Sequence, residues 1–152
     1  MRVGLISDTH GLLRPEALER LRGASRIIHA GDIGGAEVLA SLRALAPLTA
    51  VRGNNDRAGW ARAVRATESV RIGEVRVYVV HDLSELEIDP AADGFRVVVS
   101  GHSHRPRIEA RAGVLYVNPG SAGPRRFRLP VAVARLEIAG TSVRATIEEL
   151  EV

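Results

Sequence analysis

Hydrophobic residues in the first third of the chain alternate between short apolar runs and helical spacing. Residues 2–7, 26–29 and 48–52 form short, mainly aliphatic runs that are typical of buried strands. Between them, Pro15 suits a first helical position and Gly23 can close that helix, while the apolar face of a second helix ends at Pro47. We therefore expect strand, helix, strand, helix, strand, which implies a parallel sheet with right-handed crossovers.

The second half of the chain favours antiparallel hairpins. Extended segments flank Gly73-Glu74, Gly113 and Gly140-Thr141. Residues 82–95 are ambiguous, because their apolar residues fit a short helix that Pro90 would end. No linker or internal repeat marks a boundary, so we expect one α/β domain over residues 1–152, with a parallel and an antiparallel portion.

Composition narrows the possible chemistry. The chain is 45% apolar and 26% charged, which allows a buried core, and its longest apolar runs are far shorter than the ~20 residues of a membrane span. With no signal-peptide core at residues 1–8, we expect a cytoplasmic protein that does not cross a membrane. Cysteine and lysine are absent, which excludes disulfides, thiolate ligands, Schiff-base lysines and a Walker-A lysine.

The isoelectric point of about 10.4 is a weak indicator of nucleic-acid binding. All 21 basic residues are arginine and the formal net charge is only +3. Because arginine does not titrate below pH ~12, a small excess of it moves the isoelectric point far up. We therefore do not expect specific nucleic-acid binding.

Each strong strand candidate ends beside a side chain that can bind a metal ion. Open α/β sheets bind ligands at the carboxyl ends of their strands, so these side chains are expected to converge. They are Asp8 and His10 after the first strand, Asp32 after the second, Asn54 after the third, His81 after residues 75–80, and His102 and His104 after residues 97–100.

Taken singly, several of these residues have ordinary structural explanations. Asp32 and Asn54 lie beside glycines, as turn and helix-cap residues do, and a lone histidine is more often structural than a ligand. His102 and His104, one residue apart in a glycine-flanked loop, are harder to explain without a metal. His29 lies inside the second strand and is expected to support the ligands by hydrogen bonding.

Seven candidate ligands exceed what one four-coordinate zinc ion needs. They fit two divalent ions about 3.5–4 Å apart that share a carboxylate and a water. Nitrogen and oxygen donors without sulfur suit manganese, iron, zinc or nickel better than calcium, and manganese is our first expectation.

Six short motifs, taken in order, resemble those of the calcineurin-like metallophosphoesterases. The match covers about residues 1–135. The order and spacing of the motifs and the small size of the chain resemble the compact phosphodiesterase branch of bacteria and archaea, which also includes a eukaryotic retromer subunit. The motifs are D-T-H at 8–10, G-D at 31–32, G-N-N-D at 53–56, His81, G-H-S-H at 101–104 and N-P-G-S at 118–121.

The resemblance implies a four-layer α-β-β-α sandwich of two mixed sheets with a dinuclear metal site. It assigns Asp8, His10, Asp32 and His104 to the first ion, and Asp32, Asn54, His81 and His102 to the second. Asp32 would therefore bridge the two ions.

The chain departs from the family pattern at two places. The family often has His-Glu after Gly-Asn, and Asn55 and Asp56 stand there in this chain. Because Asn55 can donate a hydrogen bond but no proton at neutral pH, we expect a preference for substrates with good leaving groups. Asp82 follows His81 where the family often has glycine.

Four arginines near the motifs are candidates for binding the substrate phosphate. Arg125 is the first of these, although a solvated surface position explains it equally well and explains Arg126 and Arg128 better. Arg57, beside the third motif, is a weaker candidate.

Together the residues and the resemblance predict hydrolysis of a small-molecule or nucleotide phosphodiester by a hydroxide that bridges two metal ions. Asp32 and Asn55 are the expected catalytic residues, with Asn55 also contacting substrate. The alternative is a catalytically weak binding or scaffold module of the same fold. A serine hydrolase is set aside and a dinucleotide-binding domain is not expected, because the glycine signature of each is missing. The natural substrate and homo-oligomer formation are left open.

Overall fold

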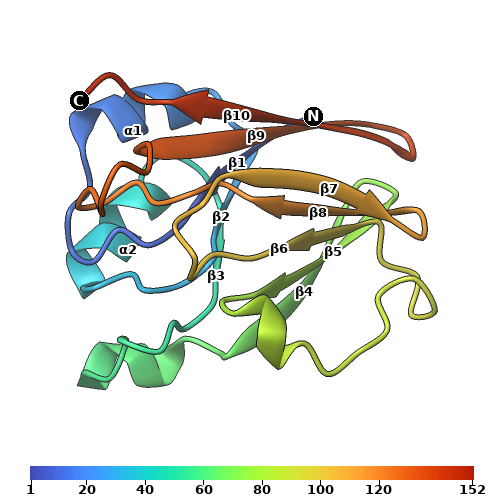
Figure 1. Cartoon of the computed structure of the whole chain (residues 1–152), viewed down its shortest axis with the longest axis horizontal. Coiled ribbons are helices and arrows are strands. Elements are labelled where there is room, and N and C mark those ends of the chain that lie inside the picture. Colours follow the sequence, from blue (N-terminus) through green and yellow to red (C-terminus); the bar gives the residue numbers. More distant parts are fainter.

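Two mixed sheets of five strands each pack face to face in the computed structural model, which describes residues 1–152 (Figure 1). The first sheet has the strand order β10-β9-β1-β2-β3 and the second the order β4-β5-β6-β8-β7. The sandwich of two mixed sheets that the motifs implied is therefore confirmed.

The first sheet contains the predicted alternation of strands and helices. Its strands β1 (Arg2–Ile6), β2 (Arg26–His29) and β3 (Leu48–Ala50) are parallel. They are connected by helices α1 (Pro15–Leu21) and α2 (Ala36–Arg43). The terminal hairpin of β9 (Ala132–Ala139) and β10 (Ser142–Glu149) extends this sheet by pairing antiparallel with β1.

The second sheet corrects the expectation of an antiparallel second half. Its hairpins are antiparallel as predicted, β4 (Thr67–Ile72) with β5 (Val75–Val80) and β7 (Arg107–Arg111) with β8 (Val114–Asn118). However, β5, β6 (Val97–Val99) and β8 run parallel to one another. The connections after β5 and β6 are long enough for crossovers, so the short hairpin turns do not determine the direction of the whole sheet.

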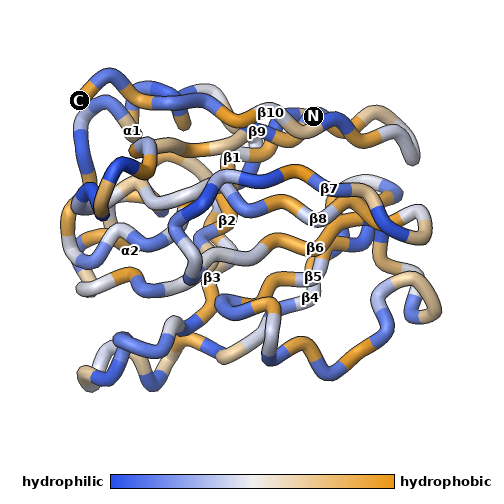
Figure 2. Tube along the Cα trace, in the orientation of Figure 1, coloured by the Kyte–Doolittle hydropathy of each residue, from blue (hydrophilic) through white to orange (hydrophobic).

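The main core lies between the two sheets. Fifteen buried residues fill it, almost all of them aliphatic side chains from the facing strands, and β5 and β6 are accordingly mostly orange in Figure 2. A second cluster of fifteen lies under α1 and α2, which cover the outer face of the first sheet. Burial of these two sets of apolar surface is the main force that holds the layers together.

The fourth layer is thin. The ambiguous residues 82–95 contain one 3₁₀ turn, η2 (Leu83–Glu85), and Leu83 and Leu86 pack on Val80 and Val98 at the outer face of the second sheet. A further 3₁₀ turn, η1 (Gly59–Ala63), precedes β4. No helix of this fold is both long and apolar enough to span a membrane.

Candidate metal centre

The loops that follow β1, β2, β3, β5 and β6 meet at one edge of the sandwich. Backbone bonds tie them together: the Asp8 amide donates to the carbonyl of Gly31 (2.9 Å) and the Gly101 amide to that of His81 (2.9 Å). Across the two sheets, the His102 amide donates to Asp8 Oδ2 (3.1 Å). Segments almost a hundred residues apart therefore contribute to one site, as the strand-end pattern predicted.

Most of the predicted ligands have a left-handed backbone. A positive φ is uncommon for residues other than glycine and carries strain of about 1–3 kcal/mol where the surroundings enforce it. Five of the seven non-glycine residues with positive φ are predicted ligands: Asp8 (54°), His10 (47°), Asp32 (54°), His102 (71°) and His104 (63°). Such clustering of strained residues is typical of functional sites.

The carboxylate of Asp8 is fully buried at the centre of the site. Its Oδ2 accepts hydrogen bonds from Ser7 Oγ (2.7 Å) and the His102 amide (3.1 Å). Its Oδ1 has no hydrogen-bond partner and faces three imidazole nitrogens, Nε2 of His104 at 3.4 Å and Nε2 of His10 and His81 at 3.9 Å each. A buried carboxylate oxygen that accepts no hydrogen bond needs another positive partner. Together with the surrounding imidazole nitrogens, it forms the kind of ligand set that binds a metal ion.

Asp32 lies beside Asp8 and is also buried. Its Oδ1 accepts from the Asn55 amide (2.9 Å) and its Oδ2 accepts from Asn55 Nδ2 (3.1 Å). The same Oδ2 lies 3.7 Å from His10 Nε2 and 3.4 Å from His81 Nε2. One oxygen of Asp32 thus faces histidines from both of the predicted ligand sets.

The ring of His81 is oriented by the second strand. Its Nδ1 donates to the carbonyl of Ala30 (2.7 Å), which leaves Nε2 facing Asp32 and Asn54 Oδ1 (3.1 Å). Gly31, with a φ of 105°, allows this approach, because a Cβ there would lie 2.6 Å from His81 Nδ1. The glycine of the G-D motif therefore leaves room for a ligand as well as providing the turn.

The electrostatics of the cluster favour a cation at its centre. Burial raises the pKa of Asp8, but the neighbouring His104 imidazole and the hydrogen bond from Ser7 outweigh it and hold that pKa below its usual value. Burial likewise raises the pKa of Asp32, and its contacts with His81 and Asn55 bring it well below the usual range. Burial lowers the pKa of His81, but Asp32 and Asp8 raise it by a larger amount, so the net change is upward. Both carboxylates are therefore ionised and attract positive charge.

His102 lies beside His81, with the two ring centroids 5.2 Å apart, but it is more exposed than the other three predicted histidine ligands. Its side chain is 46% exposed and its Nε2 lies 3.6 Å from Asp82 Oδ2. Asp82 also caps the N-terminus of η2, because it accepts from the amide (3.0 Å) and the hydroxyl (2.8 Å) of Ser84. The residue that replaces the family's glycine therefore joins the start of η2 to the rim of the site.

His29 supports the first motif from below, in keeping with its expected role. Its Nδ1 accepts from the Gly31 amide (3.1 Å), so its Nε2 carries the proton and donates to Thr9 Oγ1 (3.0 Å). Thr9 in turn donates to the carbonyl of Ile33 (2.7 Å). Complete burial lowers the pKa of His29 to about 4, so this histidine is neutral at physiological pH.

Two supporting residues had no role in the sequence interpretation. The buried carboxylate of Asp56 accepts from the amides of Ile33 (3.1 Å), Gly34 (3.1 Å) and Gly53 (2.9 Å), which joins the loops after β2 and β3. Asn118 donates to the carbonyl of Gly101 (3.0 Å) and so holds the loop of His102 and His104. Their only sequence signal was their place within the third and sixth motifs.

The candidate arginines do not gather at the centre. The guanidinium of Arg125 donates to the carbonyls of Leu129 and Val152 (3.4 Å each), and Arg126 and Arg128 are exposed. Arg57 donates to the carbonyl of Asn54 (3.2 Å), which keeps it near one predicted ligand.

The donor atoms form two groups that could each hold a metal ion, with all atoms of a group within 4.8 Å of one another. The groups are Asp8, His10 and His104, and Asp8, Asp32 and His81. Asp8 is common to both groups, and Asp32 Oδ2 lies between His10 and His81. Buried oxygen and imidazole donors without sulfur fit divalent ions such as manganese, iron, zinc or nickel.

Comparison with known proteins gives consistent results. The sequence model of the calcineurin-like phosphoesterase superfamily domain matches residues 1–141. The chain is 35% identical over 158 aligned positions to a probable metallophosphoesterase of Methanothermobacter thermautotrophicus, covering 97% of this chain and 91% of that protein.

Two solved structures have the same fold. An archaeal phosphodiesterase superposes with a TM-score of 0.79 at 26% identity, covering 97% of this chain and 100% of the other. Vps29 of Entamoeba histolytica complexed with zinc superposes with a TM-score of 0.76 at 24% identity, covering 98% and 99%.

Proposed function

Because this chain belongs to the calcineurin-like phosphoesterase superfamily, we propose that it is a metal-dependent phosphodiesterase acting on a small-molecule or nucleotide phosphodiester. The observation that carries the proposal is the buried, unpartnered Oδ1 of Asp8, which faces Nε2 of His10, His81 and His104. Such a carboxylate is costly to bury unless a cation completes its environment.

We assign two divalent ions, most simply manganese, to the seven predicted ligands. When bound, such ions lower the pKa of a water molecule and neutralise charge on phosphate oxygens. Asp32 would bridge, since its Oδ2 faces both His10 and His81. The ligands are Asp8, His10, Asp32 and His104 for one ion and Asp32, Asn54, His81 and His102 for the other.

Asn55 has two roles in this proposal. It holds Asp32 through its amide and its Nδ2, and the second Nδ2 hydrogen is available to a phosphate oxygen. It delivers no proton to a departing oxygen, so aryl esters, whose leaving groups are stable as anions, should be better substrates than alkyl esters.

The alternative is a scaffold module. Likeness to Vps29 structures supports it only as far as the fold, at 24% identity. The two groups of clustered carboxylate and imidazole donors and the strain at five predicted ligands favour catalysis, because an assembly scaffold needs neither.

The experiment is hydrolysis of bis(p-nitrophenyl) phosphate by manganese-loaded protein, comparing the wild type with Asp8→Ala and His81→Ala. Asp93→Asn, an exposed carboxylate outside the site, is the control and should retain the wild-type rate. Both site variants should lose at least about 100-fold in kcat/KM, as removal of a preorganised electrostatic group does. Undiminished rates in both variants, or no turnover by the wild type, would favour the scaffold.

A further inference from the structure

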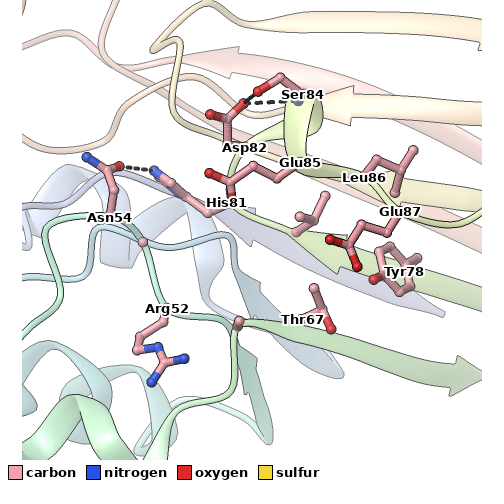
Figure 3. A pocket seen from close by; sticks show the side chains of 13 residues that line it. Arg52, Asn54, Thr67, Tyr78, His81, Asp82, Ser84, Glu85, Leu86 and Glu87 are labelled. Atoms are coloured by element: carbon pink, nitrogen blue, oxygen red, sulfur yellow. Dashed lines mark hydrogen bonds between the residues drawn. The ribbon is translucent and has the colours of Figure 1, made fainter.

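A large cleft opens directly beside the predicted metal ligands. It has a volume of about 720 Å³, within the range of small-molecule sites, and Asn54 and His81 lie at one end (Figure 3). Its floor is the outer face of the second sheet at β4 and β5, and η2 with the residues after it forms the opposite wall. A phosphodiester bound at the ligands can therefore extend one of its two ester groups into this cleft.

At the far end of the cleft, three polar side chains form no hydrogen bond with any other lining residue. Thr67 from β4, Tyr78 from β5 and Glu87 from the segment after η2 gather there in Figure 3. The side-chain hydrogen bonds among the lining residues join only Asn54 with His81 and Asp82 with Ser84. Two hydroxyls and a carboxylate are thus available to a ligand, and all three can accept a hydrogen bond from an alcohol.

The charge of the cleft lining disfavours negatively charged ester groups. Asp82, Glu85 and Glu87 contribute three carboxylates, whereas Arg52 contributes the one guanidinium. In Figure 3 the Arg52 side chain points away from the group formed by Glu87, Tyr78 and Thr67. A second phosphate or a carboxylate on the substrate would be repelled there, and a long hydrocarbon chain would leave the polar lining unpaired.

We propose that this cleft is a specificity site for an uncharged, hydroxyl-bearing ester group of the substrate, of the size and chemistry of glycerol or a ribose. Thr67, Tyr78 and Glu87 recognise its hydroxyls, while the phosphate lies at the metal ligands. The inference rests on the proposed function for the position of the phosphate. The proposal also assigns a role to residues 82–95, because Leu83 and Leu86 pack on the second sheet and fix the cleft wall that carries Glu87.

The first measurement is of binding and does not require turnover. Glycerol 1-phosphate and methyl phosphate are titrated calorimetrically into the manganese-loaded protein, because both carry the same phosphate and differ in their hydroxyls. Glycerol 1-phosphate should bind roughly tenfold more tightly, the sum of one or two net hydrogen bonds. In Tyr78→Phe and Thr67→Val that ratio should fall towards one.

Matched variants elsewhere control for general effects. Tyr116→Phe alters the only other tyrosine, which lies against Arg111 outside this cleft, and Thr141→Val alters an exposed turn threonine. Both should keep the wild-type ratio. Equal affinity for the two phosphates, no binding of either, or tighter binding of phosphocholine than of glycerol 1-phosphate would overturn the proposal, the last because it would mean that the carboxylates select positive charge.

A second measurement separates this inference from the proposed function. Hydrolysis of glyceryl p-nitrophenyl phosphate is compared with that of methyl p-nitrophenyl phosphate, which has the same leaving group. The expected kcat/KM ratio is again roughly ten. Turnover of both esters at equal rates would contradict the cleft assignment while leaving the phosphodiesterase intact. Selective binding without any turnover would support the cleft and contradict the proposed activity.

Discussion

Asp56 should be the most sensitive residue of the site that is not itself a predicted ligand. Its buried carboxylate accepts three backbone hydrogen bonds, from Ile33, Gly34 and Gly53, and so connects the loops that carry Asp32 and Asn54. Asp56→Ala removes the acceptor and leaves three amides without a partner. Asp56→Asn keeps one carbonyl oxygen but points an NH₂ group at an amide that needs an acceptor.

The expected magnitude follows from these contacts. Hydrogen bonds to a charged group contribute roughly 1.5–3 kcal/mol each. Allowing for water entering the vacated position, Asp56→Ala should lower the free energy of unfolding by about 3–5 kcal/mol, which corresponds to a Tm about 10 °C lower for a domain of this size. Asp56→Asn should cost about half as much, because one acceptor remains.

Urea denaturation followed by circular dichroism measures this difference, with Asp93→Asn as the exposed control. Calorimetric titration with Mn²⁺ on the same samples tests the link to the site, since loosened loops should weaken binding at least about tenfold. A loss of stability below about 1 kcal/mol in Asp56→Ala would refute the assigned role of the carboxylate.

Three further predictions concern the surroundings of the ligands. Gly31→Ala should lower the free energy of unfolding by at least about 2 kcal/mol more than Gly113→Ala, measured by thermal denaturation. Both glycines have positive φ, but only at Gly31 would a Cβ meet His81. Equal losses would mean that the His81 ring moves aside without a loss of stability. The unfolding free energy should fall by roughly 3 kcal/mol as the pH drops from 6.5 to 4, because buried His29, whose pKa is lowered to about 4, binds fewer protons than it does in the unfolded chain. In His29→Asn this part of the pH dependence should vanish. If it persists in that variant, another group causes it. Saturating Mn²⁺ should raise the wild-type Tm by about 5–10 °C and that of Asp8→Ala by much less, so equal shifts in differential scanning fluorimetry would place the metal elsewhere.

Much of the architecture follows from local pattern. The apolar runs at β1, β2 and β3 and the helix signals at Pro15 and Pro47 predicted the parallel part of the first sheet, which the structure contains. Strand direction in the second sheet was not accessible in this way, because a hairpin turn such as Gly73-Glu74 specifies only its own two strands. The parallel pairing of β5, β6 and β8 depends on the long connections between these strands, the second of which contains β7.

The candidate site was predictable to a similar extent. Placement of polar residues at strand ends identified side chains that the fold brings together, since parallel strands present their carboxyl ends at a common edge. The roles of Asp56 and Asn118 were not predictable, because each holds backbone atoms of a loop distant in sequence. The same holds for the cleft, whose wall is formed by a segment without regular periodicity.

Titration of Mn²⁺ into chelator-treated protein, with bis(p-nitrophenyl) phosphate hydrolysis as the readout, tests the central claim most directly. We predict a rate that is negligible without metal and rises to a plateau at two ions per chain, as a shared two-metal site requires. No hydrolysis at any ratio of metal to protein, or full activity in the metal-free chain, would contradict a metal-dependent phosphodiesterase.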